Sequence, residues 1–125
     1  MKMKLTLISD THNKHNKLNQ DLPGGDLLLH AGDISSMGYE HEINGFAYWF
    51  NKLHQYKNKV FISGNHDWGF QNNVEKVREI IAQYEDINYL EDSAFLVDNG
   101  TEKPVKVWGS PWQPEFYNWA FNLPR

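Results

Sequence analysis

The sequence predicts an α/β fold in which helices flank a mixed β-sheet. Short apolar runs that suit buried strands alternate with longer segments whose apolar residues recur every three or four positions. This alternation repeats three times before a β-hairpin pattern begins near residue 94. With 125 residues and 40% hydrophobic content, the chain is long enough for one domain with a packed core, which we place at residues 1–125.

The first predicted strand spans residues 4–9 and leads into two polar side chains, Asp10 and His12. They are two positions apart, so both would point the same way if strand geometry continued. A carboxylate beside an imidazole suits a divalent Mn, Fe, Zn or Ni ion. The alternative is that Asp10 or Thr11 caps a short helix reaching Leu18. His15 follows at helical spacing, and we expect it at the surface.

Two more predicted strands end in polar side chains. Residues 27–31 lead to Asp33, whose two carboxylate oxygens could bridge two metal ions. Residues 60–62 lead through Gly64 to three polar residues: Asn65, His66 and Asp67. Gly64 should let the backbone turn tightly and pass close to a neighbour. Ligands of open α/β sheets bind at the carboxyl ends of the strands, so the three strand ends predict one site.

The remaining elements are predicted to be structural. Apolar periodicity indicates a helix over residues 40–56 and a second helix that begins with a capping box at Asn72 and Glu75. Residues 87–90 form a fourth strand, and the strands at 94–97 and 105–108 form a hairpin connected through Asn99-Gly100. Three further histidines are expected to carry no chemistry, one in the core and two at the surface: His30, His41 and His54.

Composition excludes several classes of function. A net charge of −4 argues against binding long nucleic acids, although a small phosphate ester held by metal ions remains possible. The chain has no cysteine, which excludes disulfides, cysteine zinc sites and cysteine nucleophiles. The first apolar stretch is broken at Asp10, too early for a signal peptide, and no run approaches the ~18 apolar residues of a membrane span. We therefore expect a cytoplasmic protein without a membrane partner.

Taken together, the strand-end motifs resemble those of the calcineurin-like metallophosphoesterases. The motifs are Asp10-x-His12, Gly32-Asp33 and Gly64-Asn65-His66-Asp67, in this order and about thirty residues apart. The tail segments 109–114 and 119–125 are further similar to the small phosphodiesterases related to the fetal-brain 239 protein. The resemblance covers essentially the whole chain. It implies the N-terminal half of a four-layer α/β/β/α sandwich.

The resemblance also implies a dinuclear centre of two divalent ions, with manganese among the candidates. Asp10 and His12 would hold one ion, Asp33 would bridge, and Asn65 would contact the second ion and the substrate. A hydroxide bridging the ions would attack the phosphorus of a small phosphoester, a nucleotide-like one being a candidate. His66 would protonate the leaving group or bind the phosphate, and Asp67 would be a second catalytic residue.

The sequence departs from the family pattern in two places. Ser36 stands where the family often has a carboxylate that orients the catalytic histidine, so Asp67 or another group would have to replace it. No histidine follows Asp67, so the family's later metal-ligand histidines are absent. We therefore expect the N-terminal part of the family domain, with two, one or no ions bound. Self-association, or a chain that supplies the missing half, is expected.

Six aromatic residues crowd the C-terminal segment: Trp108, Trp112, Phe116, Tyr117, Trp119 and Phe121. We expect most of them to pack against a second sheet, and Trp112 to contact substrate by stacking. Two functions other than that of a complete hydrolase remain open. One is a catalytically incomplete remnant or assembly partner with at most one metal. The other is a nucleotide- or protein-binding module that uses the aromatic cluster.

Overall fold

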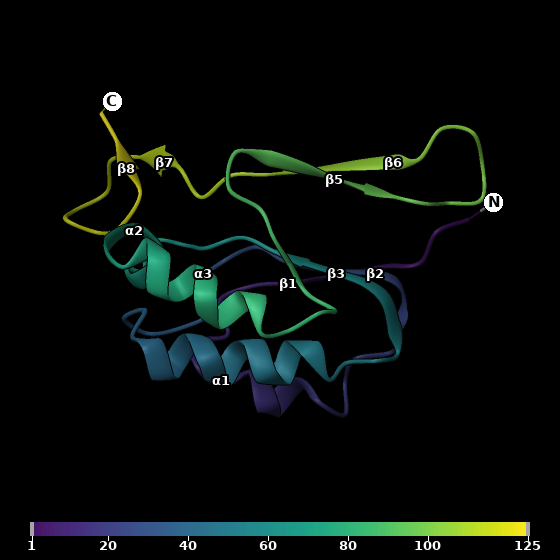
Figure 1. Cartoon of the computed structure of the whole chain (residues 1–125), viewed down its shortest axis with the longest axis horizontal. Coiled ribbons are helices and arrows are strands. Elements are labelled where there is room, and N and C mark those ends of the chain that lie inside the picture. The colour runs from purple at the N-terminus through teal and green to yellow at the C-terminus, as the bar shows by residue number, and fades with distance from the viewer. Residues whose placement is uncertain (1, 125) are drawn as a thin grey trace.

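The structure, a computed structural model, describes residues 2–124. Met1 and Arg125, the two ends of the predicted domain, lie outside the described residues. The predicted α/β class is confirmed: a parallel sheet has helices on one face and a β-hairpin on the other (Figure 1). The parallel sheet contains four strands in chain order: β1 (Leu5–Ile8), β2 (Gly25–His30), β3 (Tyr56–Phe61) and β4 (Asn88–Tyr89).

The antiparallel hairpin is a separate sheet of β5 (Ser93–Val97) and β6 (Val105–Gly109). Its connection contains Asn99-Gly100, as predicted. The parallel and antiparallel pairs predicted as one mixed sheet therefore lie in different sheets. A third, short pair consists of β7 (Gln113–Pro114) and β8 (Asn122–Leu123). The four-stranded sheet thus forms one layer, and the hairpin lies over the face opposite the helices (Figure 1).

The helices differ from prediction at their ends. Helix α1 (Glu40–Asn51) stops five residues before the predicted end, because Tyr56 begins β3. The predicted capping box at Asn72 and Glu75 is wrong. Asn72 is the last residue of α2 (Gly69–Asn72), and α3 (Val74–Ala82) begins after Asn73. The Asn73 side chain makes no cap and donates to Glu40 of α1 at 3.0 Å instead.

The main core lies between the sheet and the helices. Its aromatic centre is Phe46, Phe50 and Phe61, which are at most 1% exposed. A smaller core lies between the sheet and the hairpin and contains Leu27, Val60, Leu90 and Val97. Because successive strand residues point to opposite faces, neighbouring residues of β2 serve different cores. Residues 27–29 of β2 and 60–61 of β3 are buried or half-buried on both faces, which explains why they read as continuous apolar runs.

Three of the four histidines outside the predicted site lie where they were expected. His30 is buried, whereas His41 and His54 are exposed. The expectation for His15 is wrong: it lies in a short 3₁₀ helix (His15–Leu18), is 6% exposed, and packs against Phe46 and Trp49. Burial lowers the pKa of His15.

Within residues 2–124, no helix is both long and apolar enough to cross a membrane.

Candidate metal centre

The loop after β1 is joined to the loop after β2 by main-chain hydrogen bonds. The N–H groups of Asp10, His12 and Asn13 donate to three consecutive carbonyls, those of Gly32, Asp33 and Ile34, at 2.9–3.1 Å. These bonds continue the parallel pairing of β1 and β2 beyond the ends of the strands. They carry the first predicted motif directly alongside Asp33.

Residues with positive φ build this junction. Asp10, His12, Asn13 and Asp33 have φ values of 55°, 40°, 67° and 56°. Residues other than glycine rarely adopt a positive φ, and those that do gather at functional sites. Strand geometry, the condition under which Asp10 and His12 were predicted to point the same way, does not continue to His12. The side chains converge because the backbone turns sharply, not because it stays extended.

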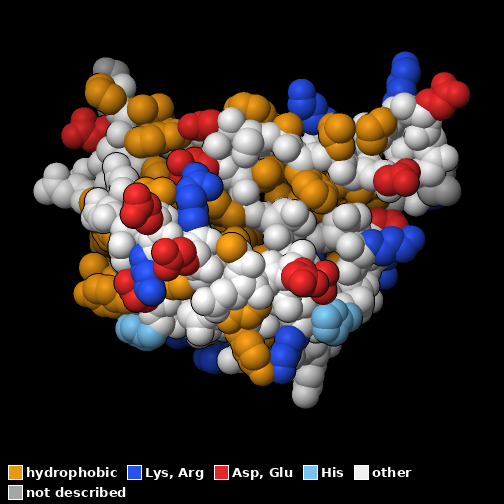
Figure 2. All heavy atoms as spheres, in the orientation of Figure 1, with side chains coloured by type: hydrophobic (Ala, Val, Ile, Leu, Met, Phe, Trp, Pro, Cys, Tyr) orange, Lys and Arg blue, Asp and Glu red, His pale blue; other side chains and the backbone are white. Residues whose placement is uncertain are grey.

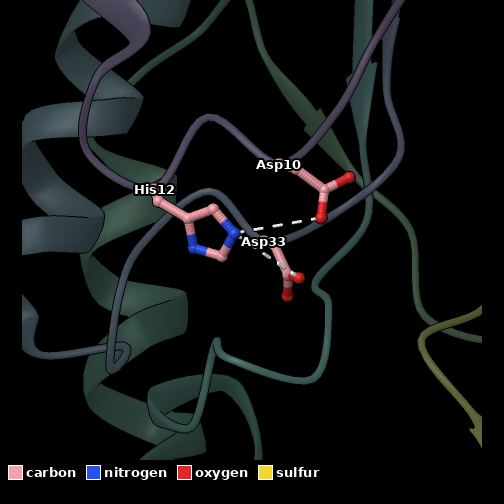
Figure 3. Close-up of side chains that lie close together, drawn as sticks. All are labelled: Asp10, His12 and Asp33. Carbon is pink, nitrogen blue, oxygen red and sulfur yellow. Dashed lines mark ion pairs between the residues drawn. The ribbon is translucent and has the colours of Figure 1, made fainter.

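Three predicted ligands meet at this point, as Figure 3 shows. The His12 Nε2 atom lies 3.9 Å from Asp10 Oδ1 and 3.9 Å from Asp33 Oδ2. One ligand atom from each residue lies within 4.8 Å of the other two. A divalent ion with ligands at about 2.1 Å keeps neighbouring ligand atoms about 3.0–3.5 Å apart. Small side-chain rotations would therefore close these three groups around one ion.

The hydrogen bonding of His12 fits a metal ligand. Its Nδ1 donates to the main-chain carbonyl of Ser35 at 3.1 Å. In the neutral ring this leaves Nε2 as the nitrogen with a lone pair, and Nε2 is the atom that faces the two carboxylates. Metal-binding histidines usually donate their other N–H to a carbonyl or carboxylate in this way. Two carboxylates and one imidazole form a donor set for a divalent transition ion.

The two carboxyl groups differ in their ionisation. A hydrogen bond with Ser9 lowers the pKa of Asp10. Burial raises the pKa of Asp33, and the neighbouring Asp10 carboxyl contributes to this effect. Two adjacent carboxylates repel one another, and a cation between them would remove that repulsion.

Asp33 also connects the loop after β2 (the second loop) to the loop after β3 (the third loop). Its Oδ1 accepts the main-chain N–H of His66 at 2.9 Å. Gly64 permits this contact, because a Cβ at Gly64 would collide with the Asp33 carboxylate and main-chain nitrogen. The predicted close approach at Gly64 is thereby confirmed, and its partner is Asp33. Asn65, half-buried in the same turn, accepts the Ala120 N–H through its main-chain carbonyl at 3.0 Å.

His66 stands beside the three-residue cluster. Its ring packs edge-on against the His12 ring, with centroids 4.9 Å apart. Its Nδ1 donates to the main-chain carbonyl of Ser36 at 3.2 Å. The group that orients His66 is therefore the main-chain carbonyl of Ser36. Neither the Ser36 side chain nor Asp67 replaces the orienting carboxylate of the family.

Asp67 has different contacts. It is fully buried, and its carboxylate accepts the N–H groups of Ile34, Ser35 and Gly64 and the Ser35 hydroxyl at 2.6–3.1 Å. Burial raises the pKa of Asp67, and these hydrogen bonds oppose that rise. Its contacts are those of a residue that holds the second and third loops together. A catalytic part for Asp67 stays a prediction.

The C-terminal segment packs over His66. The Trp119 ring lies on the His66 ring with centroids 4.1 Å apart. A pocket of about 590 Å³ opens beside Trp119, lined by Met37, Trp68, Tyr117, Asn118 and Trp119. The expected substrate contact, Trp112, instead donates from Nε1 to Asp92 at 3.0 Å and packs against Phe121. A substrate contact by Trp112 therefore stays a prediction.

Sequence reasoning missed Trp119 as a neighbour of the site. Its signals were membership of the aromatic cluster and of the tail segment 119–125, and neither distinguishes Trp119 from its neighbours. The positive φ of Tyr117 (50°) and Phe121 (57°) turns the segment back onto the third loop. Such turns at bulky residues leave no mark in composition or periodicity.

Comparison with known proteins gives consistent matches. The family model for calcineurin-like phosphoesterase matches residues 3–122. The chain is 35% identical to the human (Homo sapiens) metallophosphoesterase domain-containing protein 1, over 94% of this chain and 40% of that protein. It is 32% identical to a UPF0046 protein of Caenorhabditis elegans, over 98% of this chain and 36% of that protein. A probable rhamnogalacturonate lyase C of Emericella nidulans is 33% identical, over 98% of this chain and 12% of that protein.

Proposed function

Because the chain belongs to the calcineurin-like phosphoesterase family, we propose that it takes part in metal-dependent hydrolysis of small phosphoesters at the site formed by the first three strand ends. The chain spans 40% of the length of its human relative. The proposed activity therefore rests on the residues of this site.

The observation that carries the proposal is the arrangement of Asp10, His12 and Asp33. Three donor atoms converge within 4.8 Å, and the Ser35 carbonyl fixes the His12 tautomer that presents a lone pair to them. We propose that these residues hold one divalent ion, manganese being one candidate. Asp33 and Asn65 would contribute to a second. When bound, such ions lower the pKa of water and neutralise phosphoryl oxygens.

His66 is proposed as the general acid or phosphate contact. Its Nδ1 is engaged by Ser36, which leaves Nε2 as the nitrogen available to a substrate oxygen. A protonated imidazole can give a proton to a leaving alkoxide. The packing of the ring between His12 and Trp119 restricts its rotation, which favours one direction of proton transfer.

The pocket beside Trp119 supports a substrate with a flat leaving group. Trp68, Tyr117 and Trp119 contribute aromatic faces to its lining, and Trp119 also touches His66. A ring stacked in this pocket would lie next to the proposed acid. Base stacking on an aromatic side chain is worth ~1–3 kcal/mol. A nucleotide-like phosphodiester is therefore the proposed substrate class.

Hydrolysis of bis(p-nitrophenyl) phosphate tests the proposal. The chain should release p-nitrophenol with Mn²⁺, lose this activity in EDTA and regain it when Mn²⁺ is restored. His66→Ala should lower turnover roughly 10²–10⁴-fold while leaving bound manganese largely unchanged. His41→Ala, an exposed histidine on α1, is the matched control and should behave as wild type.

Each alternative gives a distinct result. Metal binding without turnover would favour the incomplete remnant or assembly partner. Equal loss of metal and activity in His66→Ala would place His66 among the metal ligands. Turnover that is indifferent to EDTA would contradict the proposal.

A further inference from the structure

Two consecutive main-chain carbonyls orient the two histidines of the site. The Ser35 carbonyl accepts from His12 Nδ1 at 3.1 Å, and the Ser36 carbonyl accepts from His66 Nδ1 at 3.2 Å. Both rings are therefore aimed by one short stretch of backbone. Whatever fixes that stretch fixes the direction of both Nε2 atoms.

Two buried carboxylates hold this stretch from its two ends. Asp67 accepts from Ile34 and Ser35, as described above. Glu42, in the first turn of α1, accepts the main-chain N–H groups that follow. The donors to Glu42 are Ser36 at 2.9 Å, Met37 at 3.3 Å and Tyr39 at 3.0 Å. The Asn13 side-chain amide also donates to Glu42 and ties in the loop after β1.

Glu42 is only 7% exposed, which is unusual for a glutamate unless its oxygens are satisfied. Burial works to raise the pKa of Glu42, but its donors outweigh burial and lower that pKa below the ordinary value. Gly38 pins the same loop from the other side. With φ at 77°, it lies so close that a Cβ would collide with the Trp68 and Gly69 nitrogens. Residues 36–39 are therefore held by the close packing of Gly38 on one side and by the hydrogen bonds to Glu42 on the other.

We propose that Glu42 is a positioning residue for phosphoester hydrolysis, which holds the Ser36 main chain so that its carbonyl orients His66. Glu42 touches neither the metal ligands nor His66 and acts one hydrogen bond removed. In this way it supplies the orientation that the family resemblance expects from a carboxylate at position 36. This inference rests on the proposed function for its catalytic consequence, but its structural part can be measured without activity.

The direct readout is the tautomer of each histidine, observed by ¹⁵N NMR of the EDTA-treated protein above the ordinary pKa of imidazole, about 6.5. In wild type, His66 should carry its proton on Nδ1. His30 serves as an internal reference of opposite tautomer, because its Nδ1 accepts the Gly32 N–H at 3.1 Å. Its Nε2 therefore carries the proton and donates to Thr11 Oγ1 at 2.9 Å.

Glu42→Gln is the main variant. One oxygen is replaced by an amide group that faces main-chain N–H donors, so the Ser36 segment should shift. The Nδ1–H signal of His66 should then give way to a mixture of tautomers, while the His30 signals stay unchanged. Glu40→Gln is the matched control. It removes the same charge from the same helix turn at an exposed position that contacts Asn73, and His66 should be unaffected.

In the hydrolysis assay, Glu42→Gln should lower kcat at least tenfold, with KM within about twofold of wild type. Glu42→Asp keeps the charge and should recover part of the loss. If Glu42→Gln does not fold, the His66 tautomer and the hydrolysis kinetics are measured on Glu42→Asp instead.

Two outcomes would overturn the proposal. One is a wild-type His66 that carries its proton on Nε2. The other is a folded Glu42 variant with an unchanged His66 tautomer. Absence of hydrolysis by every form, with the expected tautomer shift, would refute the proposed function and leave the positioning part of the inference standing.

Discussion

His30 is a buried imidazole with both nitrogens hydrogen-bonded in one tautomer. Burial lowers its pKa from 6.5 to about 4. As pH falls below 6.5, the unfolded chain takes up a proton at this position and the folded chain does not. Acid therefore favours unfolding until the pH reaches about 4. The gap between the two pKa values corresponds to at most about 3 kcal/mol.

We expect the unfolding free energy of the EDTA-treated protein to fall by about 2 kcal/mol between pH 6.5 and pH 5 on account of His30. Urea unfolding at several pH values measures this slope. His30→Gln should flatten it, whereas the same change at exposed His54 should retain the wild-type slope. An equal slope in wild type and His30→Gln would contradict the assignment.

At the scale of single residues, the sequence predicted which three side chains come together in the candidate metal site but not how they meet. Asp10, His12 and Asp33 were identified because they follow apolar runs, a local and readable feature. Their positive φ values are not readable, because nothing about aspartate or histidine demands that conformation. It is imposed by main-chain bonds to a loop more than twenty residues away. The burial of His15 was missed for the same reason, since its partners Phe46 and Trp49 belong to a distant helix.

Among the elements, the loops after β2 and β3 depend on Asp67. Its carboxylate is the common acceptor for donors from both loops and is fully buried. Asp67→Asn would turn an amide group toward a main-chain N–H whichever way it rotates. A buried donor left unpaired costs about 1–3 kcal/mol.

Asp67→Asn should therefore lower the unfolding free energy by about 1–3 kcal/mol in urea titration. Asp86→Asn, the same change at an exposed position, should stay within about 0.5 kcal/mol of wild type. Loss of hydrolysis by Asp67→Asn at unchanged stability would instead assign Asp67 a catalytic part.

Element types could be predicted because strands and helices have different apolar periods. The ends of the helices and strands were harder to predict from the sequence. Tyr56 follows Leu53 by three positions and so extends the helical pattern of α1, yet pairing with Gly25 places Tyr56 in β3. The cap at Asn72 failed because Asn72 is the last residue of a separate short helix, α2, which begins at Gly69 and buries Phe70 in the core.

The whole molecule leaves apolar surface uncovered on the side of the hairpin, and hydrophobic side chains are visible there in Figure 2. Leu5 and Leu7 on the edge strand β1 are 48% and 68% exposed, and Leu96 and Trp108 on the hairpin are 60% and 63% exposed. An apolar cavity of about 370 Å³, whose lining includes Leu7 and Trp108, lies between the parallel sheet and β6. Uncovered surface of this kind marks interaction sites.

We propose that a second copy of the chain covers this surface, since each copy presents the same patch and free strand edges. Light scattering after size exclusion should then give a mass above the 14.7 kDa of one chain. Trp108→Lys should shift the protein toward the monomer. Tyr48→Lys, at an exposed aromatic residue on α1, should not. A wild-type protein that is monomeric at all concentrations would contradict this proposal.

The central claim is that Asp10, His12 and Asp33 form a metal site, and calorimetric titration of the chain with Mn²⁺ tests it most directly. Wild type should bind Mn²⁺, and Asp33→Asn should weaken binding at least tenfold, because it replaces one of the two carboxylates of the cluster with a neutral amide. Asp98→Asn, an exposed carboxyl near the hairpin turn, should bind as wild type. Equal Mn²⁺ affinity in wild type and Asp33→Asn would contradict the claim.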